Sequence, residues 1–97
     1  MYTVTVTFFI HAQHQAEFKK LVLKQANDSL EKEADCHVFD VSIGVEENGV
    51  VPFFLYELYT DKASFDLHLE TAHFANFNEV SGQMVADKQV QLWDKIS

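Results

Sequence analysis

The chain contains no arginine. All seven basic residues are lysines, and they stand against fifteen acidic residues, for a formal net charge of −8. An acidic chain without arginine lacks the basic surface that nucleic-acid binding requires. It also lacks the planar guanidinium that binds phosphate or carboxylate through two parallel hydrogen bonds. The composition therefore predicts no nucleic-acid partner and disfavours a strongly anionic substrate, for which only lysine point charges are available.

Cysteine, proline and glycine are also scarce. The single cysteine, Cys36, excludes an intramolecular disulfide and favours a cytoplasmic protein, and no cation stands beside it in sequence to activate the thiol as a nucleophile. The three glycines, Gly44, Gly49 and Gly82, are scattered, so no glycine-rich phosphate loop is present. No apolar stretch approaches the length of a membrane span, and the alternating first residues do not read as a signal peptide. We expect neither a membrane association nor a dinucleotide cofactor.

Apolar and aromatic residues, by contrast, are abundant for a chain of this size. Of 97 residues, 47% are hydrophobic, and nine are phenylalanine. We predict a single domain over residues 1–97, near the small end of the usual range. A domain this small buries a limited core. The aromatic surplus is therefore expected to line a ligand pocket, a subunit interface or both.

The hydrophobic periodicity alternates between strand and helix patterns. An Asn-Gly pair at 48–49 between two strand-like runs indicates a hairpin, and Asp61 is placed to cap a helix. The expected elements are a strand at 2–10, a helix at about 13–33, strands at 36–45 and 50–59, two helical pieces between 61 and 84 with a break at 70–72, and a strand at 88–96. The order β-α-β-β-α-β predicts an α+β, ferredoxin-like fold with an antiparallel sheet.

The strands are apolar on both faces. In the third strand, Phe53 and Leu55 lie on one side, whereas Phe54, Tyr56 and Leu58 lie on the other. In a two-layer fold, helices cover only one face of the sheet. A second copy of the chain is the simplest cover for the other face, so we predict a homodimer.

Two segments resemble a known family. Residues 33–41 read Glu-Ala-Asp-Cys-His-Val-Phe-Asp-Val, residues 55–63 read Leu-Tyr-Glu-Leu-Tyr-Thr-Asp-Lys-Ala, and His68 and His73-Phe74 follow. In this order they resemble the antibiotic-biosynthesis monooxygenase family, although the family commonly has glycine where this chain has Asp35. The resemblance implies a dimeric α+β barrel. It also implies either a cofactor-free monooxygenase acting on quinols or polycyclic phenols, or an isomerase.

His68 is the first candidate catalytic residue. Imidazole titrates near neutral pH and can take a proton from a phenolic or enolic substrate and return it. The resemblance implies that this helical histidine lines the pocket; the alternative is a histidine that only packs. His73 either faces the same pocket or caps the second helical piece. The two lie five positions apart, which does not place them on one helical face, and His11 and His14 are expected to be solvated. We therefore predict no metal site.

Further candidates lie on the strands. Glu57 shares a face with Phe53 and Leu55, so it is either a buried acid with a raised pKa or part of an ion pair or an interface hydrogen bond in the dimer. Tyr56, on the opposite face, either hydrogen-bonds a substrate oxygen or packs in the core. The remaining candidates are substrate-binding residues, or alternatively plain core: His37, Phe39, Phe74, Phe77 and Trp93.

These residues and the resemblance together lead to one leading hypothesis. It is a cofactor-independent monooxygenase-like enzyme that deprotonates a small phenolic or quinol substrate, which then reduces dioxygen without flavin, haem or metal. Two alternatives stay open: an acid-base isomerase of a small carbonyl metabolite, and a non-catalytic dimeric protein that binds a small ligand.

Overall fold

The computed structural model describes residues 1–97 and has the predicted order of elements. They are β1 (Tyr2–His11), the 3-10 turn η1 (Ala12–His14), α1 (Gln15–Lys32), β2 (Cys36–Ile43), β3 (Val50–Tyr59), α2 (Lys62–His68), α3 (Ala72–Ser81), the 3-10 turn η2 (Gly82–Met84) and β4 (Val85–Asp94). The α+β, ferredoxin-like fold is thus confirmed, with its second helix divided into two. No helix combines the length and apolar character that crossing a membrane requires.

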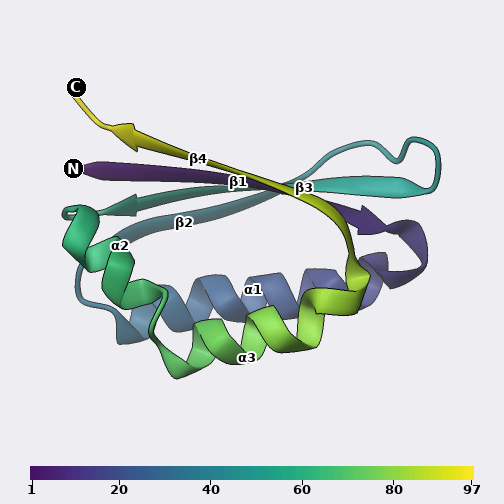
Figure 1. The fold of residues 1–97 in the computed structure, drawn as a ribbon, viewed down its shortest axis with the longest axis horizontal. Coiled ribbons are helices and arrows are strands. Elements are labelled where there is room, and N and C mark those ends of the chain that lie inside the picture. Colours follow the sequence, from purple (N-terminus) through teal and green to yellow (C-terminus); the bar gives the residue numbers. More distant parts are fainter.

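The four strands form one antiparallel sheet in the order β2-β3-β1-β4. Figure 1 shows the sheet as one layer, with α1 and α3 side by side beneath it and α2 at the end where both termini lie. β1 and β3 are central, whereas β2 and β4 are edge strands. The helices cover one face of the sheet only, and the cavity described below lies between that face and the helices.

Strand alternation creates the core. On β1, Val4, Val6, Phe8 and Ile10 are buried and point toward the helices. Phe18 of α1 meets them, and its ring centroid lies 5.3 Å from that of Phe8. Burying apolar side chains on one face of each element is the main favourable contribution to folding. The period-two pattern read from the sequence therefore sets which side of the sheet receives the helices.

The outer face of the sheet carries large side chains that no helix covers. Phe54 of β3 is 43% exposed, and Trp93 of β4 is 49% exposed. Tyr56 lies on the same face, since it alternates with the buried Leu55 and Glu57. Large apolar side chains exposed on one face of a sheet are typical of interaction surfaces.

The hairpin between β2 and β3 turns at Asn48-Gly49, as predicted. Both residues have positive φ, at 52° and 78°, and the backbones of Glu47 and Val50 exchange two hydrogen bonds of 2.9 and 3.0 Å across the turn. Positive φ at both central positions is the requirement that favours Asn-Gly in such turns.

Thr71 divides the second helical region. Its hydroxyl donates to the carbonyl oxygen of His68 at 2.8 Å, at the end of α2, and accepts from the backbone N–H of Phe74 at 3.2 Å, at the start of α3. One side chain therefore closes the first helix and caps the second. The resulting change of direction decides where His68 and His73 point.

We expect Thr71→Ala to lower the free energy of unfolding by about 1 kcal/mol, because an N-cap is lost and the His68 carbonyl loses one of its two donors, keeping only the backbone N–H of residue 71. Thr71→Ser, which keeps the hydroxyl, is the matched control and should stay near wild type. Urea unfolding followed by circular dichroism measures the difference. Equal losses in both variants would contradict the role of the hydroxyl.

Candidate functional site

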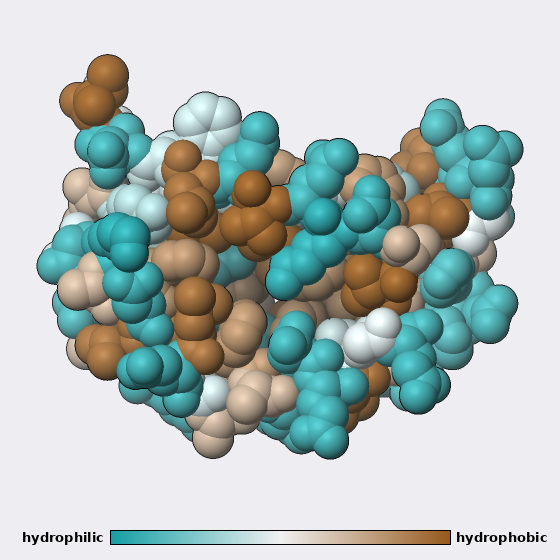
Figure 2. Space-filling view, in the orientation of Figure 1, coloured by the Kyte–Doolittle hydropathy of each residue, from teal (hydrophilic) through white to brown (hydrophobic).

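A cavity of about 240 Å³ lies between the helix-facing side of the sheet and the helices. All four strands and all three α-helices contribute to its wall, and ten of its fourteen lining residues are hydrophobic. Figure 2 shows the hollow near the middle of this face of the molecule. Four lining residues have polar side chains, which are Gln25, Glu57, His68 and Lys88. An apolar cavity with a few placed polar groups is the usual form of a small-molecule site.

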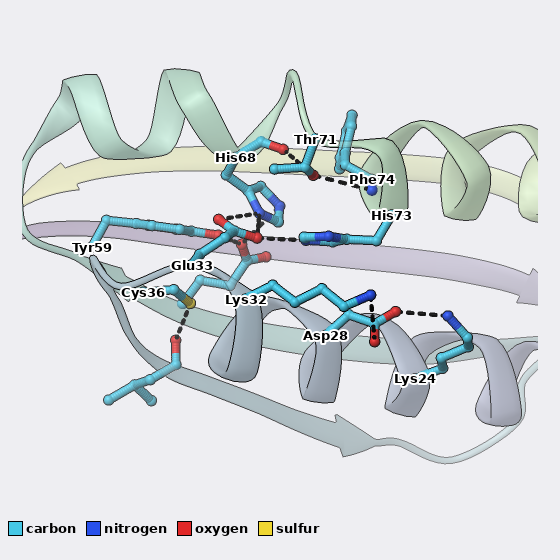
Figure 3. A network of polar contacts seen from close by, with 12 residues as sticks. Lys24, Asp28, Lys32, Glu33, Cys36, Tyr59, His68, Thr71, His73 and Phe74 are labelled. Carbon is cyan, nitrogen blue, oxygen red and sulfur yellow. Dashed lines mark hydrogen bonds and ion pairs between the residues drawn. The ribbon is translucent and has the colours of Figure 1, made fainter.

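His68, the last residue of α2, presents its ring to this cavity and is only 3% exposed. Its Nδ1 lies 3.0 and 2.9 Å from the two carboxylate oxygens of Glu33 (Figure 3). The ring of Phe65, one helical turn earlier, stacks on it at an interplanar angle of 19°. Burial lowers the pKa of His68, and the hydrogen bond to Glu33 opposes this effect. A neutral imidazole that donates Nδ1–H to a carboxylate keeps a free lone pair on Nε2.

Glu33 also binds His73, the second residue of α3. The Nε2 of His73 lies 2.6 Å from Oε2 of Glu33, so one carboxylate joins two imidazoles (Figure 3). The two histidines belong to different helices because the helical region breaks at Thr71. Their separation of five positions therefore does not keep their side chains apart. Glu33 is a site residue that the sequence analysis did not identify.

The same three residues form a donor set of the kind that binds first-row transition metals. The ligand atoms of Glu33, His68 and His73 lie within 4.8 Å of one another. Two imidazoles and one carboxylate suit zinc or iron. In this arrangement, however, both imidazoles hydrogen-bond the carboxylate directly. A metal ion would have to displace both of these contacts.

Glu57 is the acidic group of the cavity wall. It points from β3 toward the helices and is 3% exposed. The hydroxyl of Tyr59 donates to its Oε1 at 2.6 Å, and Nε2 of His68 lies 3.9 Å from the same oxygen. Burial raises the pKa of Glu57 to about 7, although the Tyr59 hydrogen bond acts in the opposite direction. The group therefore changes charge near neutral pH, which suits proton transfer.

The thiol of Cys36 is buried beside these groups but is not activated. Burial raises its pKa to about 12, and the nearby carboxylates of Glu33 and Glu57 add to that effect. The thiolate is the nucleophilic form of cysteine. This environment disfavours it, in line with the sequence-based expectation.

The structure brings most of the candidate residues from the sequence analysis together. Phe39, Phe74 and Phe77 line the cavity with His68 and Glu57, and His73 reaches the site through Glu33.

Three candidates lie elsewhere: Tyr56, His37 and Trp93. Tyr56 faces the outer side of the sheet. His37 is exposed and bonded to the Thr60 hydroxyl at 2.7 Å, because a β-bulge at the start of β2 breaks the alternation that would place it beside Phe39. Trp93 of β4 is on the outer face too, where its indole N–H donates to the Thr5 hydroxyl at 3.1 Å.

Solved structures resemble the fold over its full length. A protein of Nitrosomonas europaea, described as a candidate antibiotic biosynthesis monooxygenase, aligns with a TM-score of 0.89 and 20% identity over 100% of both chains. A Caulobacter crescentus protein with the same description aligns with a TM-score of 0.89 and 24% identity, over 99% of this chain and 90% of that one. At these identities the likeness shows the fold alone. No curated protein matches the sequence significantly.

The family assignment comes from the sequence itself. A profile of the antibiotic biosynthesis monooxygenases matches residues 1–80. These residues include the Glu33, His68 and His73 cluster. The match covers most of the chain, and the fold agrees with it. This chain belongs to the antibiotic biosynthesis monooxygenase family.

Proposed function

We propose that this protein is a cofactor-independent monooxygenase that oxidises a small phenolic or quinol-like aromatic molecule with dioxygen. One observation carries the proposal. A buried histidine, held by a carboxylate at its Nδ1, faces an apolar cavity large enough for a small aromatic molecule. Family membership supports the reaction class, and the position of His68 in the cavity makes it the candidate base.

In this proposal His68 is the general base and Glu33 positions it. The free Nε2 lone pair takes the substrate proton, and the imidazolium that forms keeps its Nδ1–H on Glu33. A carboxylate in this position fixes the tautomer and stabilises the positive charge. His73 holds the Glu33 carboxylate in place, because its ring nitrogen is hydrogen-bonded to Oε2 of Glu33. Glu33 and His73 are therefore positioning residues, whereas His68 contacts the substrate.

Proton removal makes the substrate its own reductant. A phenol whose keto tautomer carries a CH₂ group loses one proton to His68 and becomes a carbanion that is delocalised over the ring. The carbanion passes its electrons to dioxygen, and a carbon–oxygen bond forms. The resulting peroxide loses water to leave a carbonyl, so that R₂CH₂ and O₂ give R₂C=O and H₂O. The apolar wall keeps bulk water from the carbanion.

We also propose that the protein is a homodimer that assembles through the outer face of the sheet. Phe54 and Trp93 are about half exposed there, and no helix of the chain covers them. A second copy would bury both and would give Tyr56 an interface role. Size-exclusion chromatography with light scattering should give twice the 11.1 kDa of one chain.

The test of the reaction is oxygen consumption with a panel of small quinols and polycyclic phenols. We expect uptake above the uncatalysed rate, with one atom of labelled dioxygen found in the product and the other in water. Metal chelators should leave the rate unchanged, because the substrate supplies the electrons. If panel members bind in the cavity and yet none is oxidised, the proposal is wrong.

A second candidate function is a keto–enol isomerase. It is favoured by two proton-transfer groups of the cavity wall, His68 and Glu57, because Nε2 of His68 lies 3.9 Å from Oε1 of Glu57. Isomerases of this type use one group as the acid and the other as the base. Turnover of a small hydroxy-ketone without dioxygen would support this function. Ligand-induced thermal stabilisation with no turnover of either kind would instead indicate a binding protein.

A further inference from the structure

Gln25 is a buried polar side chain of the cavity wall that has an unused hydrogen-bond donor. It lies on the inner side of α1, is 3% exposed and lines the cavity. Its amide nitrogen has no hydrogen-bond partner. Native proteins pair the great majority of their buried polar atoms, and an unpaired one costs free energy of folding.

The other buried polar groups of the wall are already paired. His68 is bonded to Glu33, and Glu57 accepts from Tyr59. Lys88 is exposed and lies over the ring of Phe8 at 5.2 Å. Among the buried polar residues of the lining, only Gln25 therefore offers an unused donor. At position 25, an apolar residue of similar volume would fill the same space without leaving a buried donor unpaired. Packing alone therefore does not explain the glutamine.

We infer that the Gln25 amide is a second polar anchor for the ligand, which selects among phenolic and quinol-like molecules those that carry a second oxygen within its reach. One oxygen belongs to the ring system that His68 deprotonates, and the second accepts a hydrogen bond from the Gln25 amide. The placement of the first oxygen beside His68 rests on the proposed function. The placement of the second oxygen beside Gln25 does not depend on it. A carbonyl or hydroxyl oxygen fits better than a carboxylate, because the acidic Glu57 lines the same cavity.

The cavity volume limits the size of this ligand. About 240 Å³ lies just below the range of roughly 300–1,000 Å³ that is usual for drug-sized molecules. One or two fused rings are therefore the expected scaffold. Two polar anchors in an otherwise apolar cavity would fix the orientation of a flat ring system and bring one carbon to His68.

The test is binding without dioxygen, so that no turnover is needed. Isothermal titration calorimetry under argon compares 1,4-dihydroxynaphthalene, with two oxygens, and 1-naphthol, with one. We expect the wild-type protein to bind the diol about tenfold more tightly, a ratio typical of one added hydrogen bond. Gln25→Leu should reduce the ratio to less than about twofold. Asn27→Leu, which removes an exposed amide from the same helix, should keep it.

An unchanged ratio in Gln25→Leu, or failure of the wild type to bind either molecule, would overturn the inference. Thermal unfolding adds an independent readout. Because the amide nitrogen has no protein partner, Gln25→Leu should melt at the same temperature as wild type or higher. A clear drop would show that the amide supports the fold instead, and would also overturn the inference. Oxygen uptake separately decides the proposed function, so the two can fail independently.

Discussion

Replacing His68 with alanine is expected to lower kcat/KM for oxygen-dependent turnover by about 100-fold or more. A positioned general base contributes roughly 10²–10⁴ to the rate of a reaction that begins with proton removal. The other acid-base group that is buried in the cavity wall, Glu57, is partly protonated at neutral pH because burial raises its pKa to about 7, so it replaces the lost base poorly. The loss should appear in initial rates measured with an oxygen electrode.

Added imidazole distinguishes chemistry from packing in this variant. Alanine leaves a space beside Phe65 and Phe74 in which free imidazole can take the place of the ring. Partial recovery of the rate is the expected result for a missing base, whereas a merely structural histidine would give none. His14→Ala is the matched control, since His14 lies near the start of α1, outside the cavity. Activity within a few fold of wild type in His68→Ala would remove the basis of the mechanism.

The pH profile gives a second readout for the same residue. Burial lowers the pKa of His68 from its ordinary value of 6.5. The neutral, proton-accepting form therefore persists to lower pH than in a solvated histidine. The acidic limb of kcat/KM should fall below pH 6.5.

Much of the fold was predictable because it depends on local pattern. The alternation of Val4, Val6 and Phe8, the Asn-Gly turn and the Asp61 cap each depend on residues a few positions apart. Strand ends were less predictable. β4 begins at Val85, three residues before the expected start, because Ile10 of β1 extends far enough to pair with it. Such an end is set by the partner strand and not by the residues of the strand itself.

The candidate site was predictable only in part, for the same reason. Glu57 was placed correctly by strand alternation. Glu33 was missed because its partners, His68 and His73, lie 35 and 40 positions away. A weak signal existed: Gln25, Ser29 and Glu33 follow one another at intervals of four, so the inner stripe of the helix becomes polar toward its end. His37 was placed by simple alternation, which the β-bulge interrupts.

Replacing Glu57 with glutamine is expected to stabilise the protein at alkaline pH and not at acidic pH. Burial raises the pKa of Glu57 from 4.5 to about 7. The folded state then holds the proton more tightly than the unfolded state. Stability therefore falls as pH rises between these two values, and the loss is complete above the folded-state pKa. The free energy of unfolding of the wild type falls by about 1.4 kcal/mol per pH unit over this range. The ionisation of Glu57 therefore costs about 3 kcal/mol in total.

Glutamine removes the ionisation and keeps the shape. The hydroxyl of Tyr59 can still donate to the amide oxygen in place of Oε1. We expect the free energy of unfolding of Glu57→Gln to exceed that of wild type by about 2–3 kcal/mol at pH 8.5, and to equal it near pH 4.5. Urea unfolding at the two pH values measures this, with the exposed Glu46→Gln as the control. A gain of the same size at both pH values would trace to packing instead of charge.

We propose that the proton of Glu57 has a functional role, because the ionised carboxylate weakens the fold at this buried position beside His68. An apolar or amide side chain would serve the core better at neutral pH, so stability alone does not explain a carboxyl group there. Glu57→Gln therefore separates the two candidate reactions. Oxygen-dependent turnover needs only the base at His68 and should continue, whereas an isomerase that uses Glu57 as its acid should stop. Loss of both stability and oxygen uptake in this variant would contradict this assignment of roles.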